Sequence, residues 1–178
     1  MELSGNKAKR RPEMHLRAVG TIRSPLKEPS LVANSGDLER RPRVMEAREG
    51  KKVISELVID SDLDGILDGI EGFSHLLVLY WAHRVDKDGR SITKAHPMGR
   101  KDLPLVGIFA TCSPARPNPV CAMVVRLLEC KGNVLRVQGL DAIDGSSVID
   151  IKPYNPSYYV AEDVKVADWM AQIHREIA

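Results

Sequence analysis

Aromatic residues are scarce in this chain, which has two Phe, two Trp and four Tyr among its 178 residues. The scarcity argues against a barrel that binds RNA through a stacking surface alone. Long apolar runs are also missing, since none approaches the roughly 18–20 residues that a membrane-spanning helix needs. No apolar segment follows the polar, basic start of the chain. We therefore expect no membrane association, no secretory signal and a cytoplasmic location.

Cysteine is equally rare and follows no ligand pattern. The three cysteines, Cys112, Cys121 and Cys130, are odd in number and form neither a CxxC pair nor a Cys/His set at zinc spacing. We expect reduced thiols and no metal. The formal net charge of +2 does not demand a polyanionic partner, although it hides local clustering. With 43% hydrophobic and 28% charged residues, the chain can bury the core of a single ordered domain.

Alternating or continuous apolar runs of strand length recur along the chain. No strand–GxGxxG–helix unit is present, so the doubly wound fold is disfavoured. Short strands with little helix between them are typical of a closed β-barrel. We predict a mainly β protein, a single β-barrel-like domain with short helices and a C-terminal helix. The expected strands are 16–22, 52–59, 74–82, 105–111, 120–128, 134–140 and 148–151, and a helical turn or two is expected at 63–70.

These elements predict three segments: a disordered basic tail at 1–14, the barrel at 15–160, and a helix at 161–178 packed on the barrel. We expect Asp163 to cap that helix, and residues 23–43, rich in proline and charge, to form a long surface loop. The helix has one apolar face, made of Val166, Met170, Ile173 and Ile177.

The segment 107–119, GIFATCSPARPNP, is the most unusual stretch. Three prolines in six residues stiffen a loop that directly follows a predicted strand. A rigid loop with polar groups at a strand end suits a small-molecule site, although it could also be a plain connection. Its polar residues are Thr111, Ser113, Arg116 and Asn118.

Two further segments carry candidate chemistry. In 139–154, GLDAIDGSSVIDIKPY, Asp141 and Asp144 flank a turn beside Gly145. A carboxylate there could bind ribose hydroxyls or an amino group, or it could simply be solvated. In 73–84, FSHLLVLYWAHR, the pair His83 and Arg84 should emerge at a rim of the sheet.

These three blocks, in this order and spacing, resemble the signature blocks of the TrmO family, and the opening AVGTIRSPLKEP resembles its N-terminal block. The resemblance implies a β-barrel domain, a homodimer, and S-adenosylmethionine bound partly by the proline-rich loop. Family members methylate N6 of threonylcarbamoyladenosine at position 37 of tRNA. Carried over to this sequence, the cofactor-binding candidates are His83, Arg84, Phe109, Ala110, Ser113, Arg116, Asn118, Asp141 and Gly145.

The acceptor nitrogen is weakly nucleophilic, so loss of its proton should assist methyl transfer. Candidate proton acceptors are Asp141, Asp144 and His83, and the sequence does not choose among them. A basic cluster that could follow RNA phosphates is formed by Arg40, Arg41, Arg43, Arg48, Lys51 and Lys52.

One position departs from the family in a way that concerns the acceptor. Cys112 stands where the family's loop usually has an arginine, and its loss removes a natural partner for phosphate or carboxylate. Two alternatives to tRNA methylation therefore stay open: a methyltransferase of the same fold that acts on a small metabolite or protein, and a non-catalytic sensor of S-adenosylmethionine.

Overall fold

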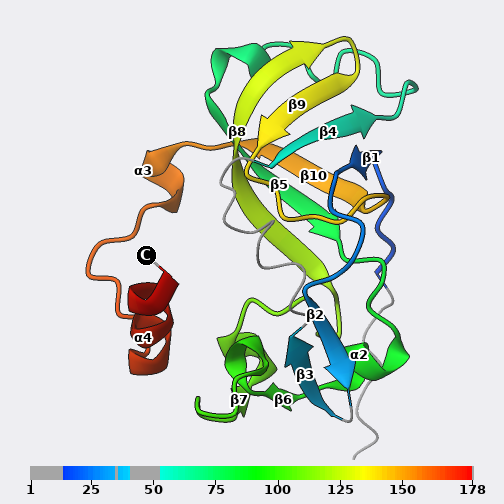
Figure 1. Ribbon diagram of the computed structural model, residues 1–178. Coiled ribbons are helices and arrows are strands. Elements are labelled where there is room, and N and C mark those ends of the chain that lie inside the picture. The colour runs from blue at the N-terminus through cyan, green and yellow to red at the C-terminus, as the bar shows by residue number, and fades with distance from the viewer. Residues whose placement is uncertain (1–13, 35, 41–52, 178) are drawn as a thin grey trace, which may run out of the picture.

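The computed structural model describes residues 14–34, 36–40 and 53–177. Strands predominate, and the helices are short (Figure 1). The strands are β1 (Gly20–Arg23), β2 (Leu31–Asn34), β3 (Asp37–Arg40), β4 (Ile54–Ile59), β5 (His75–Trp81), β6 (Lys94–Ala95), β7 (Val106–Gly107), β8 (Val120–Lys131), β9 (Val134–Gln138) and β10 (Ser147–Pro153). The α-helices are α2 (Lys87–Ser91), α3 (Pro156–Tyr159) and α4 (Asp168–Ile177), and the 3-10 helices are η2 (Ile70–Gly72), η3 (Pro97–Gly99) and η4 (Ile108–Ala110).

Six antiparallel strands close into a barrel in the order β1-β10-β5-β8-β9-β4, with β4 paired back to β1. The predicted mainly β barrel is therefore confirmed. Closure requires a close approach of β1 to β4, where Gly20 lies opposite Ile59. A Cβ on Gly20 would meet the carbonyl oxygen of Val58 at 2.4 Å, so only glycine fits this position. The 131–133 turn joins β8 to β9 as an antiparallel pair.

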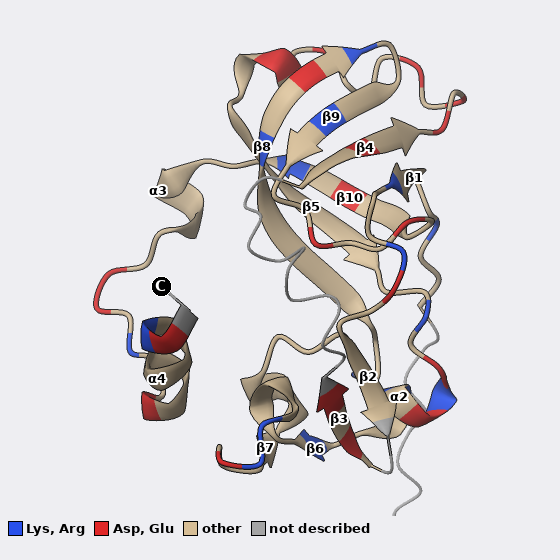
Figure 2. Ribbon diagram, viewed as in Figure 1, with Lys and Arg blue, Asp and Glu red and all other residues tan. Residues whose placement is uncertain are grey.

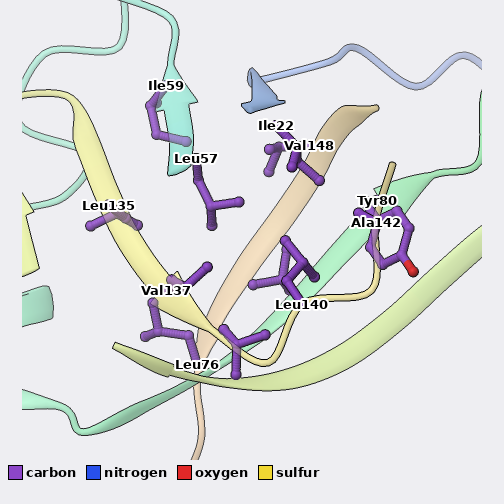
Figure 3. Packing of buried hydrophobic residues seen from close by; sticks show 12 residues of the cluster. Ile22, Leu57, Ile59, Leu76, Tyr80, Leu135, Val137, Leu140, Ala142 and Val148 are labelled. Carbon is purple, nitrogen blue, oxygen red and sulfur yellow. The ribbon is translucent and has the colours of Figure 1, made fainter. Parts of the chain in front are cut away.

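The barrel interior holds the main core, because alternate residues of each strand point inward. In β4, Ser55, Leu57 and Ile59 are buried while the residues between them are not. Figure 3 shows the core side chains gathered between the strands, with Tyr80 at the edge and its hydroxyl directed away from the cluster. The buried cluster is Ile22, Leu57, Ile59, Leu76, Val78, Tyr80, Val125, Leu135, Val137, Leu140, Ala142 and Val148.

A second group of elements lies beside one end of the barrel (Figure 1). We call β2, β3, α2, β6, η3, β7 and η4 the small lobe. Its own buried cluster is Leu38, Ile92, Ala95, Ile108 and Ala115. Asp37 connects its parts: Oδ1 accepts from the His96 amide at 2.9 Å, Oδ2 lies 2.6 Å from His96 Nδ1, and Lys101 pairs with Oδ2.

The small lobe corrects two expectations. The long surface loop expected at 23–43 is wrong, because Leu31–Asn34 and Asp37–Arg40 pair as a hairpin in which Leu38 is buried. The full strand expected at 105–111 is also wrong. Only Val106–Gly107 pair, and the chain then turns into η4 because the backbone of Ile108–Ala110 becomes helical.

Smaller differences concern helix positions. The segment 63–70 forms turns that lead into η2 rather than a helix. The C-terminal helix begins at Asp168 instead of Asp163, whose φ of 52° is left-handed. Its Glu176 pairs with Arg100, just after η3. The predicted tail lies outside the described residues except at residue 14, and the division of the chain at 160 stays a prediction. Among the described residues, no helix is long and apolar enough to cross a bilayer.

Candidate functional site

A cavity of about 1120 Å³ opens between the barrel and the small lobe. Barrel strands, the hairpin β2–β3, the proline-rich loop and helix α4 all contribute to its lining. Four of the predicted site residues line it: Arg84, Ser113, Arg116 and Asp141. The structure thus brings together three segments that are far apart in the sequence.

The proline-rich loop is held by its own polar side chains. Arg116 donates from Nε to the Ser113 carbonyl at 2.8 Å and from Nη2 to the Thr111 carbonyl at 2.5 Å. Ser113 is buried, and its Oγ accepts from the Ala115 amide at 3.2 Å. These bonds add to the stiffness that the prolines impose, so the loop presents a fixed wall to the cavity. Cys112 is exposed and also lines the cavity.

Asp141 is fixed by a residue that the sequence did not single out. The Tyr80 hydroxyl donates to Asp141 Oδ1 at 2.5 Å, and Tyr80 is buried. Burial and the nearby carboxylate raise the pKa of Tyr80 far above its usual value, so its hydroxyl remains a donor. Cys121 lies opposite Tyr80 in the β5–β8 ladder, and burial together with Asp141 raises the pKa of its thiol. Asp141 therefore lies beside two groups, the Tyr80 hydroxyl and the Cys121 thiol, that burial keeps from ionising.

Tyr80 was missed because it lies within a continuous apolar run that predicted only a core strand. The signal that could have found it is its position: Tyr80 is the last inward-facing residue before the strand ends at Trp81. A tyrosine at such a position can bury its ring in the core and direct its hydroxyl to the adjoining cavity.

His83 adjoins the cavity without being part of its lining. Its neighbours Ala82 and Arg84 both line the cavity. The His83 Nδ1 lies 3.3 Å from Ser146 Oγ, and a Cβ on Gly145 would lie 3.9 Å from the imidazole. Burial and the Arg84 charge lower the pKa of His83, partly offset by Asp144. The imidazole is therefore neutral at neutral pH.

Asp144 faces a different surface. Its Oδ1 accepts from the Ser24 amide at 2.9 Å, and its Oδ2 lies 2.9 Å from Lys27 Nζ. The bonds from Lys27 and from the Ser24 amide lower the pKa of this carboxyl. It lines a shallow depression together with Arg23 and Arg136, not the main cavity.

The remaining predicted residues lie around the site. Arg84 pairs with Glu28 at 3.0 Å on the cavity wall. Phe109 and Ala110 belong to η4, and Phe109 is 80% exposed. The Asn118 carbonyl accepts from the Val120 amide at 2.7 Å. Phe109, Ala110, Asn118 and Gly145 are not among the lining residues. Most of the predicted basic cluster lies at 41–52, outside the described residues.

Helix α4 supplies an apolar part of the lining that the sequence did not assign to the site. The predicted apolar face holds at Met170 and Ile173, but Val166 precedes α4 and is exposed. The spacing did not indicate what the face would cover. The lining residues of α4 are Trp169, Met170, Ile173 and His174.

The arrangement suits a small polar ligand. Among the described residues, no group of three or more His, Cys, Asp and Glu could hold a metal ion. The cavity offers the Asp141 carboxylate to amino or hydroxyl groups, the Arg84 guanidinium to a carboxylate, and apolar walls to a flat ring.

Blue and red segments are interspersed along the described ribbon (Figure 2), and the charged residues that line the cavity are likewise of both signs. Arg84 and Arg116 line it together with Glu28, Glu39, Asp86 and Asp141. A mixed lining is suited to a ligand that carries both an amino and a carboxylate group, and less to a simple polyanion.

A family model and several known proteins match most of this chain. A family model described as the tRNA-methyltransferase O N-terminal domain matches residues 33–159. A protein of Methanothermobacter thermautotrophicus named a probable S-adenosyl-L-methionine-binding protein is 42% identical over 142 residues, covering 80% of this chain and 90% of its own. The Escherichia coli tRNA (adenine(37)-N6)-methyltransferase is 34% identical over 142 residues, covering 78% of this chain and 56% of its own.

A solved structure shares the fold. The crystal structure of TrmO from Pseudomonas aeruginosa superposes with a TM-score of 0.62 at 23% identity, covering 88% of this chain and 63% of that chain. This chain thus spans less than two thirds of the length of both that protein and the Escherichia coli relative.

Proposed function

Because the chain belongs to the tRNA-methyltransferase O family, we propose that it transfers a methyl group from S-adenosylmethionine to N6 of threonylcarbamoyladenosine at position 37 of tRNA. The observation that carries the proposal is the cavity in which Asp141, Arg84 and the proline-rich loop meet. The Escherichia coli relative, whose name states this position and atom, supports the choice of acceptor. The Methanothermobacter relative's name supports the cofactor.

S-adenosylmethionine fits the chemistry of these residues. It carries an amino group, a carboxylate, ribose hydroxyls and an adenine ring. Asp141, oriented by Tyr80, is suited to an amino group or hydroxyls, whereas Arg84 is suited to the carboxylate. The loop around Ser113 and Arg116 would form the wall beside the adenine. His83, Phe109, Ala110, Asn118 and Gly145 remain candidates for further contacts, as the resemblance implied.

When bound, the cofactor supplies an electrophilic methyl group on a sulfonium. The bond from N6 to that carbon forms as the carbon–sulfur bond breaks, sulfur keeps the electron pair as a neutral thioether, and N6 loses its proton. Holding the two reactants in line is the main task of the cavity. Of the three proton-acceptor candidates, we favour His83, because its imidazole is neutral at neutral pH.

The other two candidates have different tasks in this proposal. Asp141 is assigned to the cofactor because Tyr80 fixes its orientation. Asp144 is engaged by Lys27 and the Ser24 amide and faces the shallow depression. It would help only by supporting the turn that carries Gly145.

Cys112 favours a second candidate function. The Cys112 side chain lines the cavity where the family usually has an arginine, and a thiol offers no positive charge to a phosphate or a threonyl carboxylate. A methyltransferase acting on a small metabolite or a protein would not need that arginine. For tRNA, Arg116 or Arg84 would have to compensate. A homodimer and a cytoplasmic location also remain predictions, and sedimentation of the purified chain tests the first.

The test is incubation of the purified chain with methyl-labelled S-adenosylmethionine and tRNA carrying threonylcarbamoyladenosine, followed by nucleoside analysis. We expect label in the N6-methylated nucleoside. Binding of S-adenosylmethionine without transfer to any acceptor would select the sensor. Transfer to a small-molecule extract but not to tRNA would select the second candidate.

A further inference from the structure

The C-terminal helix contributes to the cavity although it lies beyond the part of the chain that matches the family model. That match ends at residue 159, and α4 begins at Asp168. Trp169, half-buried in the first turn of α4, lines the cavity together with Met170. The helix therefore adds a wall to a site most of whose other lining residues lie within the family domain.

Specific contacts keep α4 at this position. Glu176 pairs with Arg100 outside the helix, and Gln172, one turn earlier within α4, donates to Glu176 at 2.9 Å. Ile173 is only 7% exposed, so the helix is seated through its apolar face. Figure 2 shows charged positions at the ends of α4 and none between them. Met170 and Ile173 of this face line the cavity.

The cavity is slightly larger than most cavities that hold one small ligand. Ligand cavities usually measure roughly 300–1,000 Å³, and this one, at about 1120 Å³, exceeds that range. Of the Phe, Tyr and Trp residues in the described part of the chain, Tyr80 and Trp169 line the cavity. Tyr80 is buried and committed to Asp141, so Trp169 is the ring that a second planar ligand could contact.

We propose that Trp169 forms the acceptor side of the cavity and stacks on the unpaired nucleobase of the RNA substrate, either the target adenine or its neighbour. The inference rests on the proposed function and names the residue that would hold its acceptor. Proteins hold single-stranded RNA bases by stacking them on aromatic side chains, and this contact tolerates different bases. A tryptophan face also requires no charge, which suits a site whose family arginine is replaced by Cys112.

The first test compares Trp169→Phe with Trp169→Leu. Both variants fill the apolar wall, but only phenylalanine can stack. Trp169→Phe should keep kcat/KM for tRNA within about threefold, and Trp169→Leu should lower it at least tenfold, about 1.4 kcal/mol. The Kd for S-adenosylmethionine and the Tm should match between the two. Val166→Ala is the control, because Val166 lies three residues before Trp169 but does not line the cavity. This substitution should leave kcat/KM for tRNA unchanged.

Equal kcat/KM for the Phe and Leu variants would overturn the inference, because packing alone would then explain Trp169. A loss of S-adenosylmethionine affinity in Trp169→Leu, with KM for tRNA unchanged, would overturn it too, since Trp169 would face the cofactor. If either of these two results is found and the wild type methylates tRNA, the role of Trp169 is wrong but the proposed function stands. If the wild type methylates no tRNA, the proposed function fails.

A second measurement does not depend on turnover. The chain has two tryptophans, and Trp81 lies on β5 under Arg90, so Trp81→Phe leaves Trp169 as the single indole fluorophore. An anticodon stem-loop RNA should quench the fluorescence of that variant if a base stacks on Trp169. RNA that binds without quenching would overturn the stacking contact, whatever the methylation assay gives.

Discussion

Replacing Asp141 by asparagine tests the proposed cofactor contact with little change in shape. The amide oxygen of asparagine can still accept from Tyr80, whose hydroxyl lies 2.5 Å from Asp141 Oδ1. The substitution therefore removes the negative charge and keeps the orientation. A hydrogen bond to a charged group contributes about 1.5–3 kcal/mol, which corresponds to roughly a 10- to 150-fold increase in Kd.

Isothermal titration calorimetry with S-adenosylmethionine measures this change directly. Asp144→Asn is the matched control, because Asp144 lies three residues away but binds Lys27 and does not line the cavity. We expect its Kd to stay within about threefold of the wild type, since no carboxylate contact to the cofactor is lost. The reasoning is refuted if Asp141→Asn binds like the wild type while its Tm is unchanged, or if both variants weaken binding equally.

Three further outcomes follow from the same contacts. If His83 takes the N6 proton, kcat should fall as pH falls through the pKa of His83, which lies below the ordinary value of about 6.5. His83→Asn should lower kcat roughly a hundredfold. An unaltered pH profile of kcat in this variant would exclude the role. Burial opposes ionisation of Asp37, but hydrogen bonds from Lys101 and His96 outweigh it and lower the pKa. Asp37→Asn should therefore lower Tm by roughly 3–10 °C at pH 7, and the difference should shrink as pH falls through the lowered pKa; equal Tm values at pH 7 would contradict this. Arg116→Ala should lower the rate of tRNA methylation at least tenfold, about 1.4 kcal/mol, whereas Cys112→Arg should leave that rate unchanged or raise it. Initial rates of methylation measure both effects. A lower rate in Cys112→Arg together with an unchanged rate in Arg116→Ala would contradict the role of Arg116.

Most of the barrel could be predicted from the sequence because each of its strands carries a sustained apolar pattern. Ile54–Ile59 alternates between the core and the outside, and His75–Trp81 is a short apolar run. The small lobe could not be predicted in the same way. Its strands have two or four residues, and Leu31–Asn34 follows a proline-rich, charged segment that resembles a loop. Only pairing with Asp37–Arg40, which the local pattern does not specify, makes it a strand.

Part of the lining of the candidate cavity could also be predicted from the sequence. Ser113, Arg116 and Asp141 came from polar residues in unusual segments, and all three line one cavity. Asp144 has the same chemistry as Asp141 and lies on the same turn, so only the structure separates the two carboxylates. Trp169 belongs to a helix whose apolar spacing predicts that it packs but not where. Such long-range placement depends on side-chain contacts like Arg100–Glu176, which leave no periodic signal in the sequence.

The most direct measurement of the central claim is transfer of label from methyl-labelled S-adenosylmethionine to tRNA, with threonylcarbamoylated tRNA compared to the same tRNA lacking that modification. The proposed function predicts label at N6 of the threonylcarbamoyladenosine in the first sample and almost none in the second. The absence of label from both, with S-adenosylmethionine bound by the chain, would contradict it.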